Sequence, residues 1–389
     1  MNLDRAEKIA RTVLYEGYML YPYRPSSTKN RQRWTFGTLY PEQYREVRCG
    51  SERSSVQTQC LFTADSGAAA KPGEEHVPGP VLSISVRCLH LSARRIFAAG
   101  QALPEPASGT QSSVKASSGG ENAYQEVESL RVGTALHESW EETVECRFDK
   151  SATLAELLLA PQLAGFSFPA ATRDELLQDS AGRTAGLIRR TQELVEGEVQ
   201  LSAERLPNAN AFRLTVQVRN QTCIPGKDDD RNSALSRSLL SVHTILGIGG
   251  GAFVSMLDPP EQLRAAAAEC RNVGTYPVLA GEPGESDVVL SSPIILYDHP
   301  QIAPESGGDF FDSTEIDELL SLRVMTLTED EKREMAGADE HVRQVLERAE
   351  RFGRDQLLKT HGVIRNLRPV SGSEQARLLP EIPKGKDAA

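Results

Sequence analysis

A segment near the N-terminus combines basic and aromatic side chains and contains no acid. Residues 21–41, which we name the basic head, include four cations and no Asp or Glu, although the whole chain has a net charge of −11. Guanidinium groups bind carboxylates through charge-assisted hydrogen bonds and stack on aromatic rings. We therefore predict a binding site for an anion or an acidic partner, made of Tyr21, Tyr23, Arg24, Lys29, Arg31, Arg33 and Trp34.

The same residues have a second interpretation, as a packed aromatic cluster. Long basic side chains can bury their stems against such a cluster while their charged ends reach water. Pro22 and Pro25 exclude a helix here, so we expect a structured loop in either case. The residue types alone leave both interpretations open.

Potential metal ligands gather in a second segment. Asp298, His299 and Glu305 bring one imidazole and two carboxylates into a short stretch. That ligand mixture suits a divalent ion such as Ni, Fe, Mn or Zn. The alternative is a polar turn at the end of a strand.

Other common catalytic motifs are missing from the sequence. The six cysteines form no Cys-x-x-Cys pair, and no His-Glu-x-x-His or Gly-x-Ser-x-Gly spacing occurs. The glycine-rich stretch 247–251 lacks the Gly-Lys-Ser/Thr of a phosphate loop, so we expect a glycine turn there. We expect no cofactor, and an enzyme is less expected than a binding protein.

Charge is distributed unevenly along the chain. Residues 305–345, which we name the acidic block, contain twelve acids and four bases. The negative net charge disfavours a general nucleic-acid binder. We expect the basic head to contact the acidic block, within one chain or between two copies, so a homo-oligomer stays open. No apolar run is long enough for a membrane span and the N-terminus has no signal pattern, so we expect a cytoplasmic protein.

Hydrophobic periodicity predicts an α+β fold with a β-rich, sandwich-like centre, an N-terminal helix and C-terminal helices. Alternation over 81–88, 199–203 and 212–218 is typical of strands, and the last two form an expected antiparallel hairpin. The composition suggests five segments: 1–64 with the N-terminal helix and basic head, a linker over 65–80, a β-rich domain over 81–225 with a loop at 99–120, an α+β region over 226–355, and a flexible tail over 356–389.

Capping patterns predict where the helices begin. Asp4 with Glu7 indicates the first helix, Ser151 a short one, and Asp258-Pro-Pro-Glu a helix that continues to about residue 271. Two further helices are expected after Asp312 and Thr328.

Four stretches carry a resemblance to a known family. They are Leu14-Tyr-Glu-Gly-Tyr-Met-Leu-Tyr-Pro-Tyr-Arg-Pro, Ser255-Met-Leu-Asp-Pro-Pro-Glu, Cys270-Arg-Asn-Val-Gly-Thr-Tyr-Pro-Val-Leu and Ser292-Pro-Ile-Ile-Leu-Tyr-Asp-His-Pro. The sequence resembles an uncharacterised bacterial family that is encoded beside uptake NiFe-hydrogenase genes. The resemblance implies an accessory or maturation role and supplies no catalytic residue.

Two functions are therefore expected. The first is a non-enzymatic accessory protein that binds a protein partner, which the resemblance suggests is a hydrogenase subunit or a maturation factor. The alternative is a metal-handling or metal-dependent enzyme that uses Asp298, His299 and nearby carboxylates.

Overall fold

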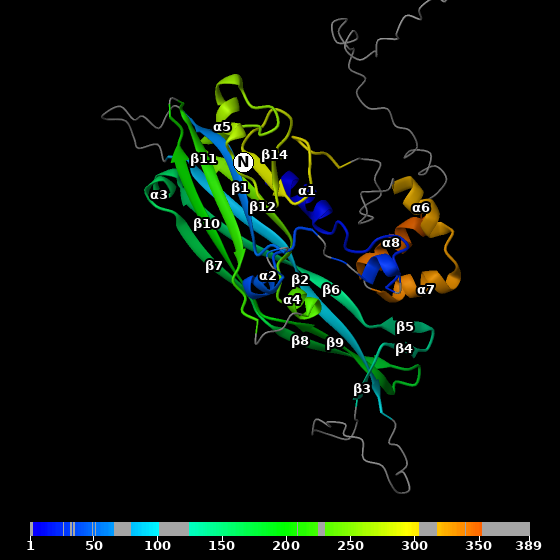
Figure 1. Cartoon of the computed structure of the whole chain (residues 1–389). Coiled ribbons are helices and arrows are strands. Elements are labelled where there is room, and N and C mark those ends of the chain that lie inside the picture. Colours follow the sequence, from blue (N-terminus) through cyan, green and yellow to red (C-terminus); the bar gives the residue numbers. More distant parts are fainter. Residues whose placement is uncertain are drawn as a thin grey trace, which may run out of the picture.

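Two antiparallel sheets form the centre of this computed structural model (Figure 1). The structure describes residues 3–25, 27–31, 33, 36–48, 50, 52–65, 79–100, 124–207, 209–224, 230–302, 317–338 and 340–351. Within these residues, the first sheet has the strand order β13-β1-β11-β10-β7. Its strands are β1 (Ser55–Ala64), β7 (Gln162–Phe168), β10 (Val195–Arg205), β11 (Ala211–Asn220) and β13 (Gly251–Phe253).

The second sheet has the order β14-β15-β12-β2-β9-β8, and β3 and β6 also pair with β2. A small hairpin of β4 and β5 lies beside it. The bounds are β2 (Val81–Ala99), β3 (Tyr124–Val127), β4 (Ser129–Val132), β5 (Ala135–Glu138), β6 (Trp140–Thr153), β8 (Ala171–Gln178), β9 (Thr184–Gln192), β12 (Leu240–Gly249), β14 (Tyr276–Leu279) and β15 (Val288–Ser292).

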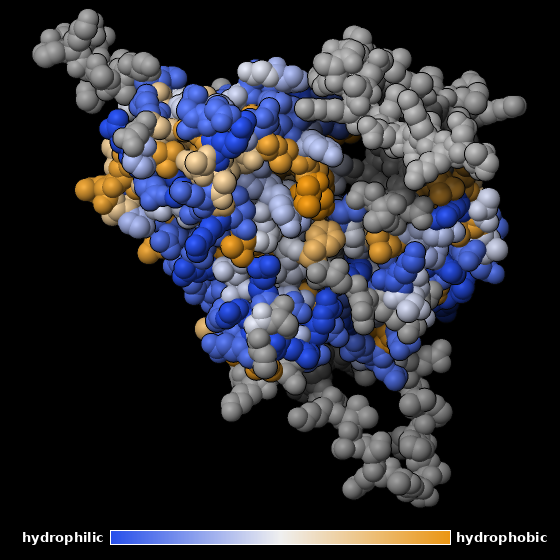
Figure 2. Space-filling model, turned by 45° about the horizontal axis from the view of Figure 1, so that its top comes forward, coloured by the Kyte–Doolittle hydropathy of each residue, from blue (hydrophilic) through white to orange (hydrophobic). Residues whose placement is uncertain are grey.

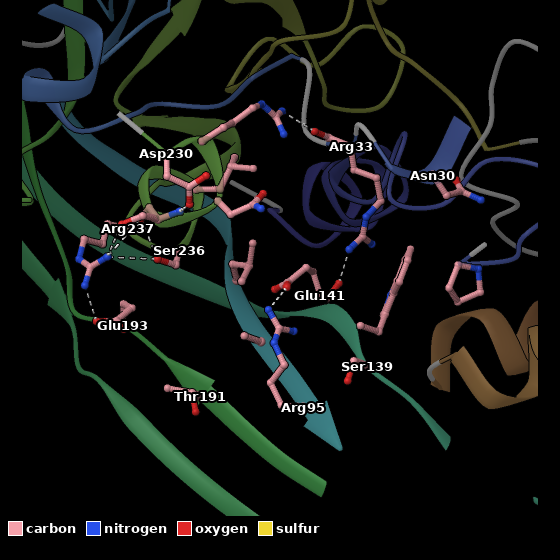
Figure 3. A pocket seen from close by; sticks show the side chains of 18 residues that line it. Asn30, Arg33, Arg95, Ser139, Glu141, Thr191, Glu193, Asp230, Ser236 and Arg237 are labelled. Carbon is pink, nitrogen blue, oxygen red and sulfur yellow. Dashed lines mark hydrogen bonds and ion pairs between the residues drawn. The ribbon is translucent and has the colours of Figure 1, made fainter. Parts of the chain in front are cut away.

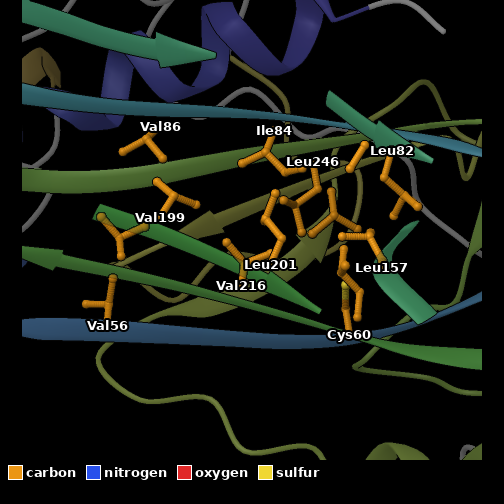
Figure 4. Packing of buried hydrophobic residues seen from close by; sticks show 14 of the residues in the cluster. Val56, Cys60, Leu82, Ile84, Val86, Leu157, Val199, Leu201, Val216 and Leu246 are labelled. Atoms are coloured by element: carbon orange, nitrogen blue, oxygen red, sulfur yellow. The ribbon is translucent and has the colours of Figure 1, made fainter. Parts of the chain in front are cut away.

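The two sheets pack face to face through apolar side chains (Figure 4). Alternate residues of β2 point into this core, from Leu82 through Ile84 and Val86 to Cys88, and meet Val199 and Leu201 of β10 together with Val216 of β11. Period-2 alternation places every second side chain on one face of a strand, so the same face of β2 stays apolar along its first half. The predicted β-rich, sandwich-like centre is confirmed.

β2 runs through most of the second sheet and changes its neighbour on one edge. β12 pairs with it from Val81 to Leu89, and β9 pairs with it from Ala93 to Ala98. On the other edge β6 pairs with it continuously from Val81 to Arg94. The edge between Leu89 and Ala93 is therefore the place where one neighbour ends and the next begins.

Helices cover the face of β2 that points away from the sandwich core. Helix α1 (Asp4–Leu14) packs Ala6, Ile9 and Ala10 against β12 and β15. The basic head follows, with the 3-10 turn η1 (Thr28–Arg31) and α2 (Glu42–Val47). The remaining helices are α3 (Leu154–Leu159), α4 (Arg231–Ser236), η3 (Glu261–Leu263), α5 (Arg264–Ala268), α6 (Asp317–Met325), α7 (Glu329–Ala338) and α8 (Glu340–Arg351).

The C-terminal helices α6, α7 and α8 pack beside the basic head and the β4–β5 hairpin (Figure 1). A Cβ atom on Gly337 of α7 would lie 2.5 Å from the Leu136 carbonyl oxygen of β5. Only glycine lets the helix backbone approach the hairpin this closely. No helix in the described ranges is long and apolar enough to cross a membrane.

Several local expectations are confirmed. β10 and β11 form the predicted antiparallel hairpin, with Leu201 opposite Val216. Thr328 and Glu331 form a capping box at the start of α7, as predicted. Gly250 has a φ of +78° in the turn between β12 and β13, so the expected glycine turn is confirmed at Gly250, while residues 247–249 end β12 and open no helix.

Other helix starts differ from the prediction. Leu3 is the N-cap of α1 and Asp4 already lies in its first turn, while Thr153, with Glu156, caps α3 in place of Ser151. The helix expected from residue 259 to 271 is limited to η3 and the five residues of α5.

Contacts with β1 explain why this helix ends early. The Arg271 N–H donates to the Gln59 side chain, the Asn272 side chain accepts from the Gln59 N–H, and Val273 pairs with Gln57. These contacts draw the chain into an extended course along β1, so tertiary pairing overrides the helix propensity of the alanines.

The two sheets contain strands from three of the composition-based segments. β1 lies in 1–64, β12 to β15 lie in 226–355, and the other strands lie in 81–225. Most of the predicted linker, most of the 99–120 loop, the Asp312 cap and the tail over 356–389 lie outside the described residues.

Candidate functional site

Two residues of the predicted partner-binding set lie inside the protein. Tyr23 is fully buried and only 7% of Arg33 is exposed. The Arg33 guanidinium donates to the carbonyl oxygens of Tyr18 (3.1 Å) and Glu141 (2.6 Å), and lies 3.7 Å from the centre of the Trp140 ring. These contacts match the packed aromatic cluster, and Arg33 joins the head to β6.

The other predicted residues of the head lie nearer the surface. Tyr21 is half-buried beneath the guanidinium of Arg323. Lys29 is exposed, and Arg31 ends η1, although its side chain is not among those described. Trp34 lies outside the described residues.

Arg24 connects the head to the acidic block. Its guanidinium lies 3.2 Å from a carboxylate oxygen of Glu331 and 3.7 Å from one of Glu334, both on α7. Apolar contacts accompany these ion pairs, since Leu320, Val324, Met335, Val342 and Val345 of the block share a core with the tyrosines of the head. The contact between basic head and acidic block is confirmed, and it is made within one chain.

A cavity of about 730 Å³ opens where β2 changes its neighbour (Figure 3). Leu91, Ala93 and Arg95 of β2 form its base, because the end of β9 and the start of β12 diverge there. The head closes one side through Asn30 and Arg33, and α4 closes another. We treat this cavity as the candidate functional site.

Four arginines and three carboxylates line the cavity. Arg95 is held by Glu141 at 2.6 Å, and Arg237 by Glu193 at 3.0 Å. Figure 3 shows Arg33, Arg95 and Arg237 around the same hollow. The fourth arginine, Arg231, donates to the Arg33 carbonyl oxygen at 2.7 Å.

Arg231 also contacts Tyr40, which belongs to the core beneath the head. Burial raises the pKa of Tyr40, and the positive charge of Arg231 opposes that rise. The Tyr40 hydroxyl is therefore protonated near neutral pH, and it serves as a structural partner of Arg231.

The cavity surface is half apolar. Leu91, Ala93, Trp140 and Leu235 supply carbon surface between the arginines. The indole N–H of Trp140 is buried and has no hydrogen-bond partner among the described atoms. The lining residues, all of them described, include no His, Cys or Lys, and their acids are Glu141, Glu193 and Asp230. The guanidinium groups give this cavity the chemistry to bind an acidic ligand.

The predicted metal ligands are engaged in main-chain contacts. The Asp298 carboxylate accepts hydrogen bonds from the Leu279 N–H at 2.8 Å and from the Ser255 hydroxyl. The Nδ1 atom of His299 lies 3.0 Å from the Gly281 carbonyl oxygen, and Glu305 lies outside the described residues. In the part of the chain that the structure covers, no three His, Cys, Asp or Glu side chains are placed to hold a metal.

Three of the described cysteines offer little nucleophilic character. Burial raises the pKa values of Cys60 and Cys88, and that of Cys146 to about 11. These thiols are therefore protonated at neutral pH, and the thiolate is the reactive form.

The surface carries apolar residues in small groups between hydrophilic ones, as Figure 2 shows on the face with α5 and β14. Ile295 and Tyr297 are 72% and 86% exposed, in the segment that follows β15. Scattered apolar residues are ordinary on protein surfaces, so the cavity remains the more distinctive feature.

Comparison with protein-family models and with curated proteins finds no match. Among solved structures, the secretin InvG of the Salmonella SPI-1 type III secretion injectisome, in its open gate state, is 14% identical with a TM-score of 0.14. The match covers 63% of this chain and 64% of the secretin chain. A TM-score this low carries no argument about fold or function.

Sequence reasoning found only Arg33 among the charged residues of the cavity. Arg95, Glu141, Glu193, Arg231 and Arg237 come from segments far apart along the chain. Their spacing has no regular period, so no motif could have joined them. The weak signal was the pair Arg94-Arg95, which are consecutive basic residues beyond the predicted strand at 81–88.

Proposed function

We propose that this protein is a non-enzymatic accessory protein that binds another protein by holding an acidic segment of it in the arginine-lined cavity. The observation that carries this proposal is the lining itself. Four arginines and three acids line the cavity together with apolar side chains, and the lining, all of it described, contains no His, Cys or Lys. A cavity of about 730 Å³ falls within the range of ligand-binding sites in proteins.

Arg95 is the arginine best placed to meet a partner. Its side chain is 38% exposed, whereas Arg33 is 7% exposed and the side chain of Arg237 is 17% exposed. A partner carboxylate would compete with Glu141 for the Arg95 guanidinium and gain a charge-assisted hydrogen bond, which contributes about 1.5–3 kcal/mol. Binding should weaken with added salt, because both groups remain partly solvated.

The resemblance to the hydrogenase-associated family suggests the kind of partner, namely a hydrogenase subunit or a maturation factor. The metal-handling alternative has less support. Asp298 and His299 are engaged with the main chain, and no three-ligand cluster exists among the described residues.

The test compares capture of proteins from the native host by three forms of the full chain. The forms are wild type, Arg95→Gln in the cavity and Arg173→Gln as a control. Arg173 is exposed on β8 and does not line the cavity. We expect a partner that wild type and the control retain, and that Arg95→Gln binds about tenfold or more weakly in a titration with purified components.

Two measurements complete the design. Thermal unfolding of the three forms should give nearly equal midpoints, because Arg95 lies at the surface of the cavity. Capture of the same proteins with equal affinity by all three forms would refute the proposal, as would capture that does not depend on salt.

A further inference from the structure

A second, smaller hollow lies at the seam between the sheet and the acidic helices. It has a volume of about 320 Å³. The sheet side contributes Arg94 of β2 and Arg190 of β9, and the helix side contributes Arg333 of α7 and Arg343 of α8. Four arginines therefore line one hollow, from β2, β9 and the consecutive helices α7 and α8.

On the sheet side, two carboxylates accompany the two arginines, and Arg94 also donates to the carbonyl oxygens of Glu138 and Gly337. Arg94 donates to one oxygen of Glu142 at 3.0 Å, and Arg190 donates to the other at 2.7 Å. One carboxylate is thus shared by two guanidinium groups. Arg190 also reaches Glu175, the only acid among the lining residues, all of which are described.

The helix side holds arginines that can change partner at little cost. Arg333 and Arg343 pair with Asp330 and Glu340, each three residues earlier on its own helix. The arginine side chains are 54% and 49% exposed, and their partners are 86% and 63% exposed. Exposed pairs of this kind contribute little to stability, so a bound anion can replace them.

A neutral side chain inside the hollow also senses its positive charge. Burial lowers the pKa of His137, and Arg94 and Arg343 lower it further, while Glu175 opposes them. The imidazole is therefore mostly uncharged near neutral pH and can accept a hydrogen bond or donate one to a bound anion.

We propose that this hollow binds a phosphate group, and that the bound phosphate joins the acidic helices α7 and α8 to the sheet. Planar guanidinium groups match the oxygens of phosphate, two hydrogen bonds at a time. Arginines from both sides would contact one tetrahedral anion. A carboxylate has only two oxygens, so it would connect the two sides less completely. This site is separate from the cavity and does not depend on its function.

The test is a calorimetric titration of the full chain with inorganic phosphate, with sodium chloride at matched ionic strength as the reference. The variants are Arg333→Gln with Arg343→Gln, and Arg351→Gln as a control at the exposed end of α8, where the side chain is 79% exposed. We expect one saturable site in wild type and in the control, and at least tenfold weaker binding in the double variant. Methyl phosphate in a second arm shows whether the site also accepts a phosphate ester.

Thermal unfolding separates ligand binding from a structural effect. Phosphate should raise the unfolding midpoint of wild type and the control above that in chloride, and should leave the double variant nearly unchanged. The Arg95→Gln variant should bind phosphate normally even if it loses its protein partner. Absence of a saturable phosphate site in wild type, or equal binding by the double variant, would overturn the inference.

Discussion

His243 makes the stability of the fold depend on pH. The side chain is fully buried in β12, where Nδ1 lies 2.8 Å from the Ser241 carbonyl oxygen and Nε2 lies 3.3 Å from the Ser292 hydroxyl. A carbonyl only accepts, so Nδ1 carries the hydrogen and Nε2 accepts from Ser292. Burial, with Arg87 nearby, lowers the pKa of this imidazole from 6.5 to about 4. A proton on Nε2 would cost the Ser292 contact and place a charge in the core.

The direction of the effect follows from the two pKa values. The unfolded chain takes up the proton near pH 6.5, and the native chain takes it up only near pH 4. Acid therefore favours the unfolded state. The contribution of His243 is complete above about pH 6.5 and falls as the pH drops toward 4. Linkage gives a loss of about 2 kcal/mol between pH 7.5 and pH 5.

The assay is urea unfolding of wild type and His243→Gln at several pH values from 7.5 to 5. Glutamine stays neutral and can still donate to the Ser241 carbonyl oxygen. We expect the variant to be less stable at pH 7.5 and to lose about 2 kcal/mol less than wild type on acidification. Buried His90, whose pKa is also lowered, acts in both proteins and cancels in the difference. Equal pH dependence of the two proteins would refute the reasoning.

Two other changes test the head and the acidic helices. Arg33→Met should lower the free energy of unfolding by about 3 kcal/mol or more, because it leaves the carbonyl oxygens of Tyr18 and Glu141 without their donor. Urea unfolding measures this change. A loss below about 1 kcal/mol would contradict the buried role of Arg33. Thr328→Ala should lower the free energy of unfolding by about 1 kcal/mol, because it removes the cap of α7. The control Thr326→Ala lies outside the cap and should lower it less. Equal effects of the two changes would show that the cap does not stabilise the protein.

The strands that the sequence revealed are those in which apolar and polar residues alternate. Phe212, Leu214 and Val216 alternate with polar residues, and β11 has that burial pattern. β12 is buried on both faces from Leu240 to Ile248, so no alternation marks it and its type could not be predicted. The early end of α5 depended on its contacts with β1, which no local pattern contains.

The contacts of the basic head could be predicted only in part. Charge complementarity between head and acidic block is visible in composition, and the Arg24 contact with α7 was predictable in kind. The buried state of Arg33 was one of two open interpretations, because its partners Tyr18 and Glu141 only meet it in the folded chain. The protein partner and the metal-binding role stay predictions.

The course of β2 has a consequence for how the protein unfolds. One uninterrupted strand from Val81 to Ala99 takes part in the sandwich core through Leu82 and in the head core through Leu91. Neither core can lose this strand without exposing apolar surface of the other. We therefore expect the amide hydrogens along β2 to exchange with solvent only through a global opening, so that the sandwich and the head behave as one cooperative unit.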